Sequence, residues 1–116
     1  MTAFEELLVW RRARVLTGDV YKLVRGSGIA HDFAFRDQIQ RAVLSITANI
    51  AEGAERGQPR KFAYFLRIAK ASSGELRSHL ILASDLGLCQ GAAAKRLQDE
   101  LAQIGRMLGA LIQRLA

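Results

Sequence analysis

The fold is decided by the stretch LQDELAQIGRMLGALIQRL at residues 97–115, where apolar side chains recur at intervals of three and four. The members of this apolar series are Leu97, Leu101, Ile104, Leu108, Leu111, Ile112 and Leu115. Residues at these intervals share one side of an α-helix, while polar residues such as Asp99 and Gln113 face away from it. The pattern therefore predicts an amphipathic helix with one buried stripe.

Three earlier segments carry the same kind of apolar stripe. They predict helices over residues 4–24, 33–55 and 59–86. Asp32 is a suitable N-cap for the second helix, and Pro59 suits the first position of the third, where its missing N–H costs nothing. Four helices joined by short connections predict an all-α, antiparallel up-down-up-down bundle that forms a single domain over residues 1–116.

The composition limits where the protein works and what it binds. The chain has 116 residues, one cysteine and a formal net charge of +6. No apolar run approaches the ~20 residues that a membrane span needs, and the N-terminus does not resemble a signal peptide, so we expect a cytoplasmic protein without membrane contact. The positive charge favours a polyanion such as nucleic acid, although basic charge that serves only solubility is the alternative.

The sequence offers no recognisable catalytic, metal or cofactor site. His31 and His79 are the only histidines, and Glu75 precedes His79 by four residues instead of the three found in di-metal bundles. Neither a nucleophile elbow nor a phosphate-binding glycine loop is present in the sequence. We therefore expect a protein that is not an enzyme and that holds neither a metal nor a cofactor.

Basic residues form two stripes, which are the candidate nucleic-acid-binding residues. The first stripe comprises Arg11, Arg14, Lys22 and Arg25, and the second comprises Arg60, Arg67, Lys70 and Arg77. Together they could form one positive surface that follows phosphates, or they could be ordinary solvated helix faces. No aromatic residue is interleaved with them as a base-stacking platform, which favours contact with the backbone over single-strand reading.

A polar seam borders the apolar stripe of the second helix. Its residues are Gln38, Arg41, Ser45, Asn49, Glu52 and Arg56, with Glu75 of the third helix as a further candidate member. Buried polar groups need partners, so we expect Arg41 to pair with Glu52 or Glu75. A structural role, in fixing helix register or a subunit contact, is favoured over a ligand site.

A second apolar patch lies off the core face of the first helix. It consists of Phe4, Leu7, Leu8 and Val15. Self-association would cover it, which makes these residues the candidate oligomer contact. An N-terminal turn that folds back on the bundle is the alternative.

Several segments resemble a known family. RDQIQRA at residues 36–42, Ser45-Ile46 and NIAEG at residues 49–53 are similar to the four-helix-bundle proteins encoded in intervening sequences of bacterial 23S ribosomal RNA genes. Further matches are Val9-Trp10 with Ala13, Phe65–Ala69 with Ser72 and Glu75-Leu76, and Arg106–Leu108. Lys61, where the family has an acidic residue, and Pro59 depart from the pattern.

This resemblance implies a homopentameric ring in a bacterial cytoplasm. It also implies a relation to the accessory variability determinant of diversity-generating retroelements, a basic pentamer that associates with nucleic acid and a reverse transcriptase. Our first hypothesis is a non-enzymatic, homo-oligomeric accessory protein that binds RNA or DNA backbones. The second is an oligomeric scaffold or adaptor for a protein partner such as a reverse transcriptase.

Overall fold

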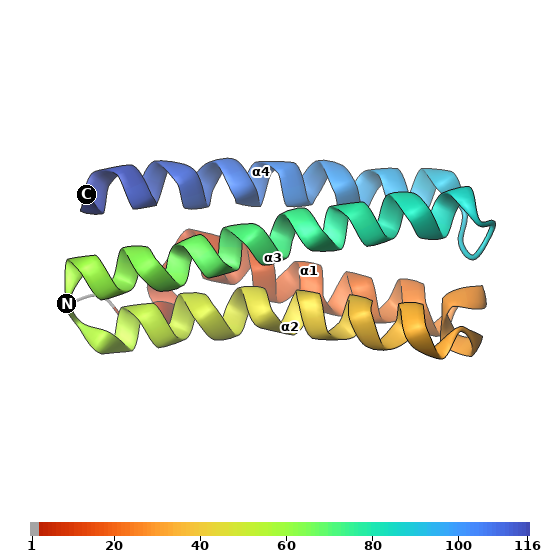
Figure 1. Ribbon diagram of the computed structural model, residues 1–116, viewed down its shortest axis with the longest axis horizontal. Coiled ribbons are helices and arrows are strands. Elements are labelled where there is room, and N and C mark those ends of the chain that lie inside the picture. Colours follow the sequence, from red (N-terminus) through yellow and green to blue (C-terminus); the bar gives the residue numbers. More distant parts are fainter. Residues whose placement is uncertain (1–2) are drawn as a thin grey trace.

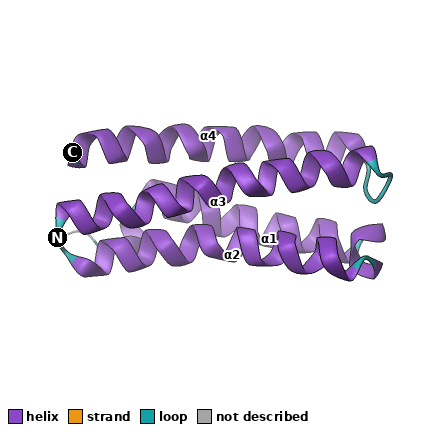
Figure 2. Ribbon diagram, viewed as in Figure 1, coloured by secondary structure: helices purple, strands orange, loops and turns teal. Residues whose placement is uncertain are grey.

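The computed structural model describes residues 3–116, and all of its regular structure is helical (Figures 1 and 2). The elements in chain order are the short 3₁₀ helix η1 (Phe4–Glu6), α1 (Leu8–Arg25), the 3₁₀ helix η2 (Gly28–His31), α2 (Phe33–Arg56), α3 (Pro59–Asp85) and α4 (Gly91–Leu115). The described residues contain no strand. The prediction of an all-α protein with four long helices is confirmed.

The helix ends follow the local chemistry that the sequence predicts. The backbone N–H of Phe35 donates to Asp32 Oδ1 at 3.2 Å, so Asp32 caps α2. Gly57 ends this helix with a φ of 70°, a left-handed conformation that favours glycine, and Pro59 begins α3 two residues later. These two residues account for the tight connection between α2 and α3.

The four helices run alternately up and down along a rod of 43 × 20 × 19 Å, with the start of α1 and the end of α4 at the same end (Figure 1). Helix α1 packs against α2 and α4, and α3 packs against the same two helices. Consequently α1 and α3 lie diagonally across the bundle. This arrangement determines which surface residues can act together.

The apolar stripes meet in one core, as their spacing predicts. The largest fully buried side chains are Leu16, Val20, Ile29, Ile39, Ile46, Ile50, Leu66, Leu76, Leu80, Leu101, Ile104 and Leu108. All four helices contribute to this set. Burial of these apolar surfaces is the main force that holds the helices together.

The first helix begins later than its pattern predicts. Leu7 has extended backbone angles, with φ −73° and ψ 125°, and separates α1 from the 3₁₀ turn at residues 4–6. Two contacts hold this turn against α1: Arg11 Nε donates to the carbonyl oxygen of Glu5 at 2.8 Å, and the Phe4 ring packs edge-on against Trp10 at 5.1 Å between centroids. The N-terminal turn is therefore folded back on the bundle.

Helices α2 and α3 approach each other closely near their shared connection. A Cβ atom at Gly53 would lie only 2.9 Å from Phe65 Cβ and 3.2 Å from the carbonyl oxygen of Phe62. Only glycine, whose side chain is a hydrogen atom, fits between the two backbones here.

Within the described residues, none of the helices has the length and hydrophobicity that a membrane crossing requires.

Candidate nucleic-acid interface

A groove of about 720 Å³ runs between α3 and α4. Small residues lie along it, including Ser73 and Gly74 from α3 and Ala102, Gly105 and Gly109 from α4. A Cβ at Gly109 would lie 3.6 Å from Lys70 Cε, so alanine fits there, whereas longer side chains would project into the groove. Small side chains on both helices therefore keep the groove open.

Four cationic side chains line this groove. They are Arg67, Lys70 and Arg77 from α3 and Arg106 from α4. No acidic residue lines the groove, and none of these four cations forms an ion pair with any residue in the range 3–116. The charge of the groove is thus positive and uncompensated at short range.

Three carboxylates that lie near the groove along these two helices, Glu75, Asp99 and Glu100, contact residues outside it. Asp99 of α4 pairs with Lys95 at 2.9 Å, and Glu75 of α3 contacts His79 at 3.3 Å, each one helical turn away along its own helix. Glu100 of α4 accepts two hydrogen bonds from Arg12 of α1, at 2.9 and 2.8 Å, one on each carboxylate oxygen. The cations at α3/α4 are left without such partners.

The groove continues toward the C-terminal end of α4. A second hollow shares Arg67, Lys70, Arg106 and Gly109 with it, and a third hollow contains Arg60, Tyr64 and Arg67. From Arg60 to Arg77 the distance along α3 is about 25 Å at 1.5 Å per residue. The structure thus places all four residues of the second predicted stripe along one extended hollow surface.

Arg106 is a groove residue that the two predicted basic stripes do not include. It faces away from the core on α4, as the sequence pattern predicts. The signal that could have found it is the series Ala102, Gly105 and Gly109, which marks the side of α4 that a neighbouring helix approaches closely. Arg106 directly follows Gly105 in the sequence and lines the groove together with the cations of α3. Periodicity alone does not reveal which helix that neighbour is.

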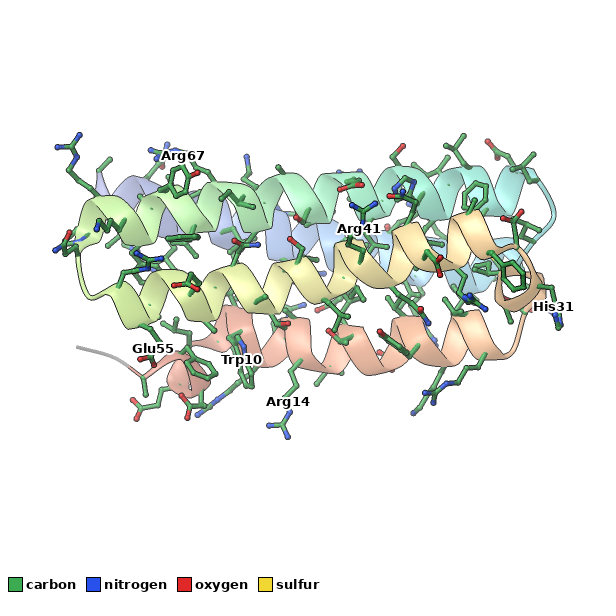
Figure 3. All side chains as sticks on the ribbon, turned by 60° about the horizontal axis from the view of Figure 1, so that its bottom comes forward. Trp10, Arg14, His31, Arg41, Glu55 and Arg67 are labelled. Atoms are coloured by element: carbon green, nitrogen blue, oxygen red, sulfur yellow. The ribbon has the colours of Figure 1, made fainter. Side chains whose placement is uncertain are left out.

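The first predicted stripe is exposed but lies elsewhere. Arg14 on α1 and Arg67 on α3 project from opposite edges of the bundle (Figure 3). Because α1 and α3 are diagonal, the expected single surface built from both stripes is wrong for one copy of the chain. The hollow beside the α1 cations is also lined by the acidic Glu5 and Asp19, which reduces its positive potential.

The aromatic environment of both stripes differs from the prediction. On α1, the guanidinium of Arg14 lies 5.7 Å from the centroid of the Trp10 ring and that of Arg25 lies 5.8 Å from the Tyr21 ring. On α3, Tyr64 lies between Arg60 and Arg67 in sequence and lines the same hollow. The expectation that no aromatic residue is interleaved with the cations is therefore wrong, because one turn of helix brings residues four apart together.

The polar seam has a partly buried centre and exposed ends. Ser45 Oγ and Ser72 Oγ are 2.8 Å apart across the α2/α3 boundary. Asn49 Nδ2 donates to the carbonyl oxygen of Ser45 at 2.8 Å and to its hydroxyl at 3.0 Å. Among residues 3–116, every buried side-chain nitrogen and oxygen has a hydrogen-bond partner. These hydrogen bonds join α2 to α3 and give this part of the seam a structural role.

The expected pairing of Arg41 is wrong. Arg41 is exposed and donates from Nη2 to Gln38 Oε1 at 2.8 Å, one turn earlier on α2. Glu52 pairs instead with Arg56 at 2.8 Å, and Glu75 contacts His79. Glu52 lies about 16 Å from Arg41 along α2, at 1.5 Å per residue, which is too far for a direct contact. Arg41, Glu52 and Glu75 each contact a residue one turn away on their own helix.

The second apolar patch is divided by the folded-back N-terminal turn. Phe4 packs against Trp10, and Leu7 packs against the core, so these two residues are partly covered within the chain. Leu8 and Val15 are 62% and 65% exposed on the outer side of α1. Of the predicted oligomer contact, these two residues remain as an open apolar pair.

The remaining reactive side chains do not gather into a site. His31 is exposed at one end of the bundle (Figure 3), and His79 packs edge-on against Phe35 with 6.4 Å between ring centroids. Burial raises the pKa of the Cys89 thiol. In the part of the chain that the structure describes, no three His, Cys, Asp or Glu side chains come together as metal ligands would.

A basic, all-α four-helix protein with an uncompensated cationic groove is the class that this geometry defines. A family model described as 23S rRNA-intervening sequence protein matches residues 5–110, and the chain belongs to that family. The family that the sequence motifs indicate is thereby confirmed.

A solved structure extends the comparison of folds. It is the crystal structure of a protein of unknown function from the S23 ribosomal protein family of Bacteroides thetaiotaomicron, with a TM-score of 0.82 and 19% identity. The similarity covers 90% of this chain and 98% of that chain. At this identity the match supports the fold alone. No curated protein matches this chain.

Proposed function

We propose that this chain is a non-enzymatic, homo-oligomeric accessory protein that binds nucleic acid through the phosphate backbone. One observation carries the proposal. The α3/α4 groove is lined by Arg67, Lys70, Arg77 and Arg106, while no acidic residue within the described range lines the groove or pairs with these cations. A groove of this kind attracts a linear polyanion.

The cations of the groove are suited to binding phosphate diesters, which every nucleic acid carries, more than to recognising a particular base sequence. Each cation that neutralises a phosphate releases condensed counterions, which supplies affinity without sequence information. Arginine offers a planar fork of donors to phosphate oxygens, and lysine offers a mobile point charge. Sequence or shape preference then comes from the nucleic acid or from a partner protein.

Self-association is the second part of the proposal. Leu8 and Val15 are large, exposed and one heptad apart on α1. A ring, such as the pentamer that the resemblance implies, needs two different contact surfaces on each copy, and this pair belongs to one of them. Since α1 is diagonal to α3, a contact through Leu8 and Val15 does not itself cover the α3/α4 groove.

Two variants of equal charge change test the proposal. The groove variant replaces the four groove cations by glutamine, and the control variant replaces Arg11, Arg14, Lys22 and Arg25 by glutamine. Each removes four positive charges, so a difference between them arises from where the charges lie. We expect the groove variant to lose most of its affinity for a structured RNA and a DNA duplex, and the control variant to lose less.

Equal losses in the two variants would contradict the groove as the binding surface. Failure of the wild-type protein to bind RNA or DNA at low salt would contradict the nucleic-acid proposal itself. That second result would favour the alternative function, an oligomeric scaffold or adaptor for a protein partner such as a reverse transcriptase.

A further inference from the structure

Tyr64 is a large aromatic side chain exposed within a cationic surface. Its exposed fraction is 58%, and it lines a hollow together with Arg60, Arg67, Leu115 at the end of α4 and Ala116 after it. Surfaces that bind unpaired nucleic acid combine an aromatic ring, on which a base stacks, with cations that contact phosphates. Arg60 and Arg67 give Tyr64 surroundings of this kind.

The Tyr64 ring contacts one neighbouring aromatic ring. It packs edge-on against Phe65, with 5.1 Å between centroids and an interplanar angle of 86°. The Arg56 guanidinium in turn lies 5.2 Å from the centroid of the Phe65 ring. A contact of this kind restricts the motion of the Tyr64 ring, which reduces the conformational entropy lost when a flat ligand stacks on it.

The position of Tyr64 links it to the α3/α4 groove. Arg67 lines both the hollow around Tyr64 and the α3/α4 groove, so the two hollows are adjacent. A strand whose phosphates follow Arg77, Lys70 and Arg67 would pass the Tyr64 ring at the end of its path. In a duplex the base faces are covered by neighbouring base pairs, whereas an unpaired strand exposes them.

We infer that Tyr64 stacks on an unpaired base and that the groove therefore prefers single-stranded nucleic acid, or the unpaired end of a structured one, over a continuous duplex. This inference rests on the proposed function and names its substrate class. Phosphate contacts by the groove cations supply most of the affinity, and the stacked base supplies the preference for single strands.

The test compares two labelled strands of equal length and charge, a twelve-nucleotide single-stranded DNA and the same backbone without bases, by fluorescence anisotropy. The variants are Tyr64→Ala and Tyr64→Phe, with Leu82→Ala as the control. Leu82 is another apolar residue of α3 and is 47% exposed. Circular dichroism and sedimentation of each variant establish that fold and assembly are unchanged.

We expect Tyr64→Ala to weaken binding of the base-bearing strand by roughly 5- to 150-fold, the equivalent of one lost stacking interaction, and to leave the baseless backbone unaffected. Tyr64→Phe and Leu82→Ala should bind both strands as the wild-type protein does. An equal loss on both strands, or no loss on either, would overturn the stacking role. A change of assembly state in Tyr64→Ala would also overturn it, and would assign Tyr64 to a subunit contact.

The groove variant separates this inference from the proposed function. It should weaken binding of both strands, because both carry the phosphates. If the groove variant weakens both strands and Tyr64→Ala changes neither, the proposed function stands and the single-strand inference fails. If the wild-type protein binds a DNA duplex but neither strand at low salt, only the single-strand inference fails. If it binds no nucleic acid at low salt, both fail.

Discussion

Replacement of Gly53 by alanine tests whether the close approach of α2 and α3 is a steric requirement. The added Cβ would lie 2.9 Å from Phe65 Cβ, about 0.6 Å inside the ~3.5 Å of an ordinary carbon–carbon contact. The same atom would meet the backbone carbonyl of Phe62 at 3.2 Å, which cannot move without its helix. Overpacking of this kind costs about 1–3 kcal/mol, while alanine in place of glycine in a helix gains about 1 kcal/mol.

A matched variant isolates the steric cost. A Cβ at Gly18 of α1 meets no atom within 4 Å, so Gly18→Ala keeps the gain in helix propensity without the clash. We expect Gly18→Ala to raise the free energy of unfolding by about 0.5–1 kcal/mol, and Gly53→Ala to fall about 1–3 kcal/mol below it. Urea unfolding at one protein concentration measures both. Equal stabilisation by the two variants would refute the steric argument.

Three further predictions concern individual side chains. Asn49→Ala removes two hydrogen bonds of a half-buried amide and should lower the free energy of unfolding by about 1 kcal/mol, whereas Glu52→Ala removes only an exposed ion pair and should change it by less than about 0.5 kcal/mol. Urea unfolding checks both, and equal losses would contradict the buried role of the seam. Gly109→Glu places a carboxylate beside Lys70 and should weaken nucleic-acid binding in anisotropy measurements, while Gly109→Gln, of similar size, should weaken it less. Equal effects of these two variants would indicate steric filling of the groove instead of charge. The raised pKa of Cys89 leaves less thiolate at pH 8, so its reaction with iodoacetamide should be slower in the folded protein than in urea. An equal rate in the two states would contradict burial of the thiol.

The helices could be predicted from the sequence because their stripes and end signals are local. Leu97 and Leu101 share a face whatever lies opposite them, and Asp32 caps the helix that follows it directly. The later start of α1 could not be predicted in this way. It depends on the packing of Phe4 against Trp10, which competes with continuing the helix.

The candidate site was predicted only in part, because it depends on which helices are neighbours. The apolar periodicity places Arg67 beside the buried stripe of α3. It does not show that α4 supplies Arg106 to the same groove. It also cannot show that the α1 cations lie diagonally opposite. Arg41 illustrates the same limit, since an exposed arginine takes the nearest acceptor on its own helix, Gln38, instead of a distant carboxylate.

The most direct test of the central claim is the slope of log affinity against log salt for the wild-type protein with single-stranded DNA and with a DNA duplex. If the four groove cations each neutralise one phosphate, the slope should be about −3 for the single strand and about −3.6 for the duplex. Affinity should then fall roughly 50- to 150-fold between 50 and 200 mM salt. Occupied grooves on several copies of an oligomer would make the slope steeper. A slope near zero, or no binding at 50 mM salt, would contradict the claim that the α3/α4 groove binds phosphate backbones.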